Sequence, residues 1–402
     1  MTINRYILSS EFCESVRDGT HDTPKRTNSG YRLVTSKHIK NGQINSDEGY
    51  FISVEDFNKI NERSLVEQWD VLMSMIGTIG EAAIVKDQPK YAIKNVALFK
   101  CGDELKAKWL YYFLCSPEGK GQLFSNQKGA SQQFISLTQL RNLQIPIRDQ
   151  STMKKITDIL SAYDDLIENN QKQIKLLEEA AMRLYKEWFV KLRFPGHENT
   201  KIVDGVPEGW EKLYIEDVCQ TVGGGTPSTK VPSYYNNGTI PWVTPTDITR
   251  NDCLILLDTE KKITEEGLAR SSAKMLPSET ILMTSRASVG FFGISEQEVC
   301  TNQGFISCIP NNKNLMMFLL LNLMSRKDEI RQKAGGATYL EINKSTFRKL
   351  IVIKPDDTLL NEFQSITYTI LKRISALKKQ SDLLKQARDK LLPKLMNGDI
   401  EV

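Results

Sequence analysis

The sequence predicts an α+β protein in which two α/β domains are separated by two long antiparallel helices that pair as a coiled coil. Two observations support this fold class. First, two stretches repeat apolar residues at alternating steps of four and three, the spacing of a helix packed along one partner. Second, these stretches and the short motifs around them recur at one fixed offset. This pattern indicates an internal duplication with a pseudo-twofold repeat.

The first helical stretch covers about residues 153–191, with Ser151 as its candidate N-cap. Its seam consists of Ile156, Leu160, Tyr163, Ile167, Asn170, Ile174, Leu177, Ala181, Leu184 and Trp188. A solvated face is expected for the charged residues between them, which are Lys154, Lys155, Asp158, Asp164, Asp165, Glu168, Lys172 and Glu178. At about 1.5 Å per residue the helix spans roughly 58 Å, too long for an ordinary domain core. It therefore requires a second helix of similar length.

The C-terminal stretch supplies that helix, with a seam of Phe363, Thr367, Ile370, Ile374, Leu377, Ser381, Leu384, Arg388, Leu391 and Leu395. Each of these residues lies 207 positions after its counterpart (363 − 156 = 207; 395 − 188 = 207). In an antiparallel pair Asn170 is expected to meet Ser381 in one hydrogen-bonded polar layer, beside Ile174 against Leu377. The predicted helix-pairing residues are Leu160, Tyr163, Ile167, Asn170, Ile174, Leu177, Ile370, Ile374, Leu377, Ser381 and Leu384.

The predicted domain boundaries follow from the repeat. They are 1–150 for the first globular domain, 151–196 for the central helix, 197–357 for a linker and the second globular domain, and 358–402 for the C-terminal helix. Strands are predicted at 31–39, 71–76, 83–85, 96–99 and 144–147, and buried helices at 108–115 and 315–323. The strand at 71–74 matches 281–284, and Gly80 matches Gly290.

Composition fits a soluble cytoplasmic protein, with 25% charged and 40% hydrophobic residues and no apolar run long enough for a signal peptide or membrane span. The net charge is only +4, so a basic binding surface would have to be local. The seven cysteines include no C-x-x-C pair, and reduced thiols are expected. His21, His38 and His197 are too scattered for a zinc site and are expected in loops or at the surface. No phosphate loop, methyltransferase motif or nuclease motif occurs, so no catalytic or metal-binding residue is predicted.

Polar loops occupy matching places in both halves and are the candidate DNA-binding elements. In the first half the candidates are Thr20, His21, Thr23, Lys25, Lys37, Lys128, Ser131, Gln132 and Gln133. In the second they are Thr226, Ser228, Thr229, Lys230, Thr246, Ser285, Arg286, Ser288, Lys333, Thr338 and Tyr339. Arg and Lys can bridge guanine, Gln can bridge adenine, and Ser and Thr hold phosphates. Any one such loop also fits an ordinary polar turn; recurrence in both halves favours binding of double-stranded DNA.

With these parts in order, the chain resembles the specificity (S) subunit of type I restriction–modification systems. The motifs that carry the resemblance are Gly-Gly-Thr-Pro-Ser at 224–228, Ile-Pro-Trp-Val at 240–243, Asn-Gln-Gly-Phe at 302–305, Val-Pro-Glu-Gly-Trp at 206–210 and Leu-Leu-Pro-Lys-Leu at 391–395. A similar first-half loop, Gly-Thr-His-Asp-Thr-Pro, occupies 19–24. The first half departs from the family pattern at 95–98, where Asn-Val-Ala-Leu replaces the Asn-Gln-Gly motif.

The resemblance implies two target-recognition domains, each reading half of a split asymmetric DNA site, with the helix pair setting the unread spacer. It implies a non-catalytic chain that scaffolds two methyltransferase (M) subunits and two restriction (R) subunits. The M subunits would use S-adenosylmethionine to methylate adenine, and the R subunits would use ATP and Mg²⁺. No cofactor is assigned to this chain. Two alternatives stay open: the recognition subunit of a related two-subunit restriction–methylation enzyme, and a coiled-coil adaptor that binds protein.

Overall fold

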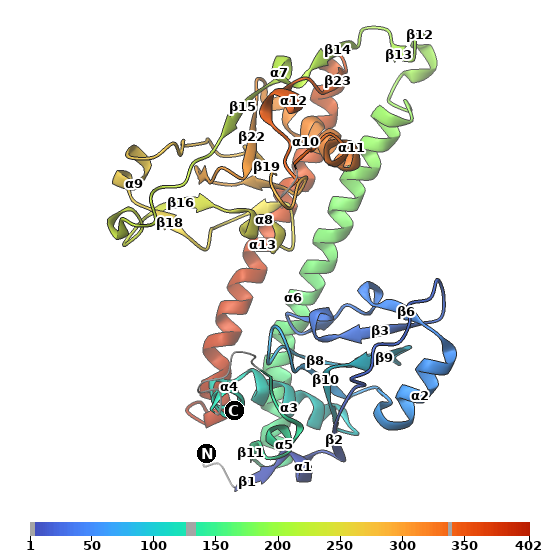
Figure 1. The fold of residues 1–402 in the computed structure, drawn as a ribbon, viewed down its shortest axis with the longest axis vertical. Helices are drawn as coiled ribbons and strands as arrows, with labels where there is room; N and C mark the ends of the chain where they lie inside the picture. The colour runs from blue at the N-terminus through green and yellow to red at the C-terminus, as the bar shows by residue number, and fades with distance from the viewer. Residues whose placement is uncertain (1–4, 126–133, 337–339) are drawn as a thin grey trace. The chain divides into compact units, whose positions relative to one another are not determined.

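The chain divides into two compact units that each combine a mixed domain with part of both long helices. The computed structural model describes residues 5–125, 134–336 and 340–402 of the 402 residues. One unit comprises residues 1–166 and 384–402, and the other comprises 167–383. The helices α6 (Gln150–Tyr185) and α13 (Asp357–Asn397) therefore contribute to both units (Figure 1).

The first unit contains three sheets with the orders β2-β10-β7-β8, β6-β3-β9 and β1-β11, and a β4-β5 ribbon. Its strands are β1 (Arg5–Leu8), β2 (Ser15–Asp18), β3 (Tyr31–Thr35), β4 (Ile39–Lys40), β5 (Gln43–Ile44), β6 (Tyr50–Ile52), β7 (Val71–Ser74), β8 (Ala82–Ile84), β9 (Tyr91–Lys94), β10 (Val96–Lys100) and β11 (Gln144–Ile147). Its short helices are α1 (Ser9–Phe12), α2 (Val54–Ser64), α3 (Glu104–Cys115), α4 (Pro117–Phe124) and α5 (Leu137–Arg141).

The second unit contains sheets with the orders β15-β22-β19-β20-β17, β18-β16-β21 and β14-β23, and a β12-β13 ribbon. Its strands are β12 (Ile202–Val203), β13 (Val206–Pro207), β14 (Glu211–Tyr214), β15 (Cys219–Gly223), β16 (Ile240–Val243), β17 (Ile255–Leu256), β18 (Lys262–Ile263), β19 (Ile281–Thr284), β20 (Phe292–Ser295), β21 (Cys300–Thr301), β22 (Phe305–Pro310) and β23 (Ile351–Lys354). Its short helices are α7 (Ile215–Val218), α8 (Pro245–Thr249), α9 (Glu265–Ala269), α10 (Met316–Ser325), α11 (Lys327–Gln332) and α12 (Lys344–Arg348).

The two units share one topology, which confirms the predicted fold class and its internal repeat. The order β2-β10-β7-β8 corresponds to β15-β22-β19-β20, and β6-β3-β9 corresponds to β18-β16-β21. The starts of α12, β23 and α13 each follow those of α5, β11 and α6 by 207 residues (344 − 137, 351 − 144 and 357 − 150). The central strands β7 and β19 are buried along their whole length, as their apolar sequences predict.

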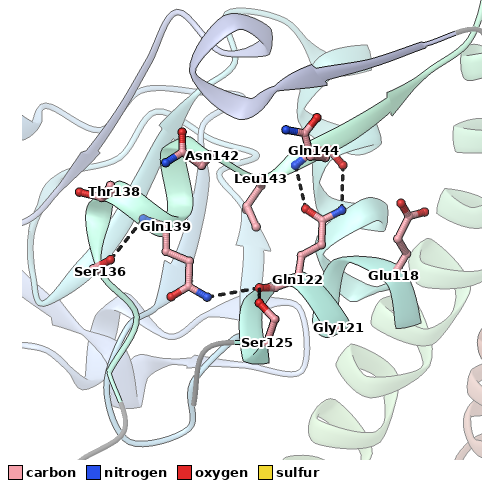
Figure 2. Close-up of a pocket in the computed structure, with 10 residues that line it drawn as sticks. All are labelled: Glu118, Gly121, Gln122, Ser125, Ser136, Thr138, Gln139, Asn142, Leu143 and Gln144. Carbon is pink, nitrogen blue, oxygen red and sulfur yellow. Dashed lines mark hydrogen bonds between the residues drawn. The ribbon is translucent and has the colours of Figure 1, made fainter. Parts of the chain in front are cut away.

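In the first unit, side chains clamp strand β11 against two helices. The Trp109 indole N–H donates to the Pro146 carbonyl at 2.8 Å. The Gln122 amide bonds the backbone of Gln144 twice, accepting from its N–H at 2.7 Å and donating to its carbonyl at 3.0 Å (Figure 2). Gln122 and Gln144 also line a hollow of about 690 Å³, in which Glu118 is the single ionisable side chain among the described lining residues. The hollow therefore belongs to the packing around strand β11, which precedes helix α6.

Helix α6 begins with a different cap from the one expected. The Asp149 carboxylate accepts the Thr152 backbone N–H at 2.9 Å and the Thr152 hydroxyl at 2.7 Å. Ser151, the predicted N-cap, lies within the first helical turn. An aspartate at this position also complements the helix dipole, which accounts for the difference.

Within the second unit the two long helices run antiparallel over a shared apolar seam. Ile174 and Leu377 belong to one buried cluster. The predicted Asn170–Ser381 hydrogen bond is wrong: Asn170 Nδ2 donates to Gln380 Oε1 at 3.1 Å, and the buried Ser381 hydroxyl has no partner among the described residues. The four-three spacing of the seam predicts which residues of the helix are buried. It does not predict which neighbouring side chain reaches the amide.

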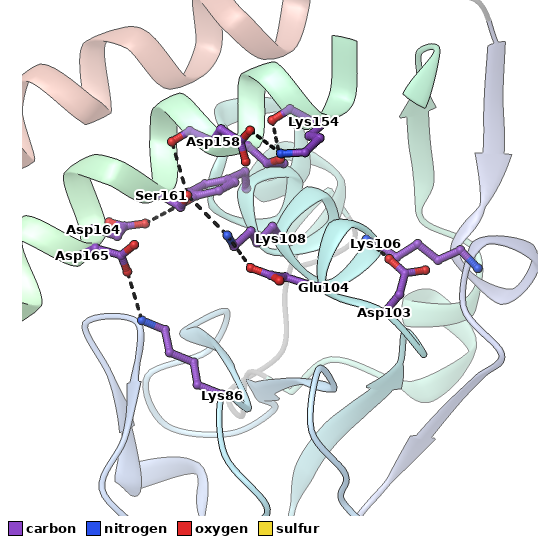
Figure 3. Close-up of polar contacts among 12 residues, drawn as sticks. Lys86, Asp103, Glu104, Lys106, Lys108, Lys154, Asp158, Ser161, Asp164 and Asp165 are labelled. Atoms are coloured by element: carbon purple, nitrogen blue, oxygen red, sulfur yellow. Dashed lines mark hydrogen bonds and ion pairs between the residues drawn. The ribbon is translucent and has the colours of Figure 1, made fainter. Parts of the chain in front are cut away.

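In the first unit, Asp164, one of the carboxylates expected on a solvated face, is used in packing. Asp164 accepts from Arg388 Nη1 at 2.5 Å and from the Tyr112 hydroxyl at 2.8 Å. Asp165 pairs with Lys86 at 3.4 Å and Asp158 pairs with Lys154 at 2.7 Å, but both of these carboxylates stay exposed, as expected (Figure 3). Asp164 is therefore a correction to the solvated face. The helix contacts its partner on one side and helix α3 on another, so fewer of its charged positions face water.

Arg388→Ala is expected to lower the free energy of unfolding by about 1–2 kcal/mol, because among the described residues the Asp164 carboxylate would keep only the Tyr112 hydroxyl as a partner. The side chains of Arg388 and Asp164 are 23% and 21% exposed, so solvent screening reduces the cost from that of a fully buried pair. Urea unfolding of a double-mutant cycle with Asp164→Ala measures the coupling. Lys390→Ala, on the exposed face of the same helix, is the control. A coupling energy of zero would contradict the prediction.

Glu178 is a second carboxylate that the solvated-face prediction misplaced. It lies half-buried on α6 and accepts the Leu254 backbone N–H at 2.7 Å. Burial raises the pKa of Glu178 to about 7; the Leu254 N–H bond lowers it and Asp252 raises it further. Between the ordinary pKa of 4.5 and this value, the folded chain holds a proton that the unfolded chain has released. Stability from this group is therefore lost as the pH rises from 4.5 to about 7.

Glu178→Gln is expected to match the wild type in unfolding free energy at pH 4, below the ordinary pKa of this carboxyl. At pH 8 it should exceed the wild type by on the order of 1–2 kcal/mol, because glutamine mimics the protonated acid. Urea unfolding at the two pH values measures the difference, with the exposed neighbour change Glu179→Gln as the control. An equal difference at both pH values would rule out titration of Glu178 as the cause.

Candidate nucleic-acid interface

In the first unit a polar cluster forms where β2 ends and β9 turns into β10. Thr20 pairs with Lys94 in an isolated bridge, and Lys94 Nζ donates to the Thr23 hydroxyl. The Nδ1 atom of His21 lies 2.8 Å from Asn95 Oδ1. The structure thus brings together three residues predicted from one loop, and adds Lys94 and Asn95 from a segment 70 residues later.

Two residues that the sequence reasoning missed anchor this cluster. Asp18 is buried at 6% exposure; it accepts from Arg63 Nη2, and its Oδ2 lies 3.0 Å from His21 Nε2. Asn95 has a left-handed φ of 53°, and its carbonyl accepts the Ser36 hydroxyl at 2.7 Å. Asp18 and its partner Arg63 lie in no recognisable motif, so only the fold could identify them, whereas Asn95 begins the segment 95–98 that replaces the Asn-Gln-Gly motif.

A short turn after β3 has an equivalent after β16. The Thr35 N–H donates to His38 Nδ1 at 3.0 Å, and the Thr244 N–H donates to Asp247 Oδ2 at 2.7 Å. His38 is only 1% exposed, which corrects the expectation of a surface or loop histidine. Burial and the neighbouring Lys37 lower the pKa of His38, in keeping with a neutral ring whose Nδ1 accepts a hydrogen bond.

In the second unit the glycine-rich segment packs on the Asn-Gln-Gly turn. The Gly225 N–H donates to the Thr301 carbonyl at 2.9 Å, and the Trp242 indole N–H donates to the Gly225 carbonyl at 3.0 Å. The hydroxyl of Thr226 donates to Gln303 Oε1. The glycines therefore permit close backbone approach between two loops.

The same turn is hydrogen-bonded to the loop between β19 and β20. The Gly304 N–H donates to Asn302 Oδ1 at 2.9 Å, and the Ser285 N–H donates to the Gly304 carbonyl at 2.7 Å. The Ser285 carbonyl accepts the Ile342 N–H at 3.1 Å. Ser285 was predicted to contact DNA, but it is buried at 3% exposure. Its backbone hydrogen bonds hold the loop in place instead.

Beyond Ser285 the loop exposes a paired arginine. Arg286 Nε donates to Glu341 Oε1 at 2.7 Å, and the Ala287 N–H donates to the Leu340 carbonyl at 2.9 Å. Ala287 has a φ of +57°, where the first unit has Gly77 at +74°. A left-handed residue with a Cβ costs about 1–2 kcal/mol, and such strain is concentrated at functional loops.

The sequence of this chain matches a family described as the type I restriction modification DNA specificity domain, over residues 9–179 and 207–392. The two matched stretches include the domain and helix of each repeat. The chain belongs to this type I specificity family.

Known relatives agree with this assignment. The MjaIX specificity subunit of Methanocaldococcus jannaschii is 29% identical over 201 residues, which are 50% of this chain and 46% of that protein's length. The putative MjaX specificity subunit of the same organism is 25% identical over 98% of this chain and 92% of its own. The crystal structure of the type I S subunit from M. genitalium has a TM-score of 0.57 at 16% identity, covering 98% of this chain and 96% of that one, and so shares the fold.

As a type I specificity chain, the protein presents most of its predicted contact residues on the surface. Exposed side chains are those of His21, Thr23, Lys25, Lys37, Thr226, Ser228, Thr229, Lys230, Arg286, Ser288 and Lys333. Thr20 and Thr246 are half-buried. Lys128, Ser131, Gln132, Gln133, Thr338 and Tyr339 lie outside the described residues.

The described residues contain neither a metal-binding cluster nor a membrane-spanning helix. No group of three or more His, Cys, Asp or Glu side chains there could hold a metal ion. Within the same ranges, every helix is too short or too polar to cross a membrane.

Proposed function

We propose that this chain is the non-catalytic DNA-recognition subunit of a type I restriction–modification enzyme and reads a bipartite asymmetric site. Each domain would read one half-site with the loops that follow β2, β3, β7 and β9 in the first unit, or β15, β16, β19 and β21 in the second. The observation that carries the proposal is that one loop framework occurs twice with different exposed side chains. A common scaffold with two surfaces suits two different half-sites.

The long helices would set the spacer between the half-sites. Helix α6 alone has 36 residues, or about 54 Å at ~1.5 Å per residue. At about 3.4 Å per base pair this length corresponds to roughly 16 base pairs. A helix of this length suits two major-groove contacts that are separated by a segment of DNA whose bases are not read.

Partner subunits would supply the chemistry. Two methyltransferase subunits would bind the helices and domains and methylate adenine with S-adenosylmethionine, and two restriction subunits would add ATP- and Mg²⁺-dependent cleavage in the cytoplasm. The chain itself would bind DNA and hold these partners.

A gel-shift series tests the proposal. The full chain, alone and with an adenine methyltransferase subunit from a type I system, is titrated against a random duplex library and the bound fraction is sequenced. We expect enrichment of one motif with two fixed parts and a fixed gap. Failure to bind DNA in both arms, with retention of protein partners only, would indicate the protein-binding adaptor instead.

A further inference from the structure

The loop between β7 and β8 and the loop between β19 and β20 are built the same way. The Ser74 hydroxyl accepts the Glu81 N–H at 3.0 Å, and the Thr284 hydroxyl accepts the Phe291 N–H at 3.0 Å. Each hydroxyl also donates to a carbonyl four residues later within its own loop. Position 76 in the first unit is therefore equivalent to position 286 in the second (76 + 210 = 286; Ser74 + 210 = 284).

Each loop tip is bridged to one residue that precedes α5 or α12. Ile76 is paired with Phe134, and Arg286 is paired with Glu341, both as isolated antiparallel bridges. Phe134 and Glu341 are themselves 207 residues apart (341 − 134 = 207). The backbone geometry is thus preserved, whereas the side chains change from an ion pair to an apolar pair.

The apolar pair is exposed and adjoins the polar cluster of the first unit. Ile76 is 42% exposed and Phe134 is 65% exposed. Val96 is paired with Ser74, so Asn95 adjoins the residue just before Ile76 in the antiparallel register. Asn95 contacts His21, which places the pair beside the predicted DNA-contacting loops. Two large apolar side chains exposed among polar loops lose contact with water when a ligand covers them.

We propose that Ile76 and Phe134 form a base-reading contact of the first domain and bind the 5-methyl group of a thymine in the major groove. Thymine is the one base that presents an apolar group there. At the equivalent place in the second domain, Arg286 would read guanine. Glu341 holds its Nε, and among the described residues its two Nη groups have no partner. This inference rests on the proposed function and assigns a base class to one position of each half-site.

Deoxyuridine tests the contact directly, because it differs from thymidine only by the missing methyl group. The full chain with its methyltransferase subunit is first used to select a motif from a random library. Each thymine of the first half-site is then replaced in turn by uracil, and binding is measured at fixed salt. We expect a loss of roughly tenfold at one thymine and little change elsewhere.

The double variant Ile76→Ala/Phe134→Ala should bind the thymine and uracil duplexes equally while keeping its other base preferences. Leu65→Ala, a change of similar exposure outside the loops, should keep the discrimination of the wild type. Thermal melting shows whether the variants are folded, and the uracil scan of the wild type needs no variant.

The outcomes separate the two claims. A wild-type chain that selects a motif but tolerates uracil at every thymine overturns this inference and leaves the proposed function standing. Loss of methyltransferase binding in the double variant, with base preferences intact, makes the pair a protein contact and also overturns it. Selection of no motif at all defeats the proposed function itself.

Discussion

Gly224→Ala is expected to lower the unfolding free energy of the second unit by about 3 kcal/mol and to weaken DNA binding with it. A Cβ on Gly224 would lie 2.1 Å from the Thr301 carbonyl oxygen and 2.2 Å from that of Asn302. Both obstacles are backbone atoms, so relief requires the glycine-rich segment and the Asn-Gln-Gly turn to separate. Thermal melting and gel shift of the full chain measure the two effects.

Gly335→Ala is the matched control for stability, because a Cβ there meets nothing within 4 Å. It should melt within about one degree of the wild type, since it creates no clash and surface substitutions are usually close to neutral. A Gly224→Ala chain that melts with the wild type would show that the two loops are not in the close contact described.

Arg286→Ala is expected to cost about 1–3 kcal/mol of affinity for the selected duplex, roughly a factor of 5 to 150, with the melting temperature unchanged. The side chain is 47% exposed and contacts only Glu341 among the described residues, so the fold depends little on it. Arg373→Ala, on the exposed face of α13, is the control.

The salt dependence of binding separates two readings of Arg286. If it contacts a base, the loss in Arg286→Ala should fall on duplexes with guanine at one position. If it contacts a phosphate, the loss should be uniform and the salt slope should fall by about 1. Unchanged binding at physiological salt would make Arg286 an ordinary surface arginine.

The helix pair and the internal repeat were predictable because the sequence patterns that encode them are periodic and occur twice. Seam residues such as Ile174 and Leu377 recur at steps set by helix geometry, and the offset of 207 residues locates the second helix from the first. The strand at 71–74 and helix α10 are short apolar segments, and their composition predicts that both are buried.

The failures come from contacts that periodicity does not encode. Asp164 and Glu178 have the spacing of a solvated face, yet each is covered by a globular domain that packs on a second side of α6. His38 was expected in a loop or at the surface because the sequence does not show that its Nδ1 accepts the Thr35 N–H in a buried turn.

Candidate site residues were predictable by chemical type only. Polar loops drew attention to Thr20, His21 and Arg286. Ile76 and Phe134 escaped because an apolar residue in isolation suggests a core. Their importance emerges only when the repeat places them opposite each other, at the position that Arg286 and Glu341 occupy in the second unit.

Exchange of one recognition domain tests the central claim most directly. Residues 1–150 are replaced by the corresponding domain of another type I specificity subunit, and the N6-methyladenine motif is mapped in DNA of cells that carry the methyltransferase subunit. We expect one half of the motif to change, while the other half and the spacer length stay as in the wild type. A motif changed in both halves would contradict it.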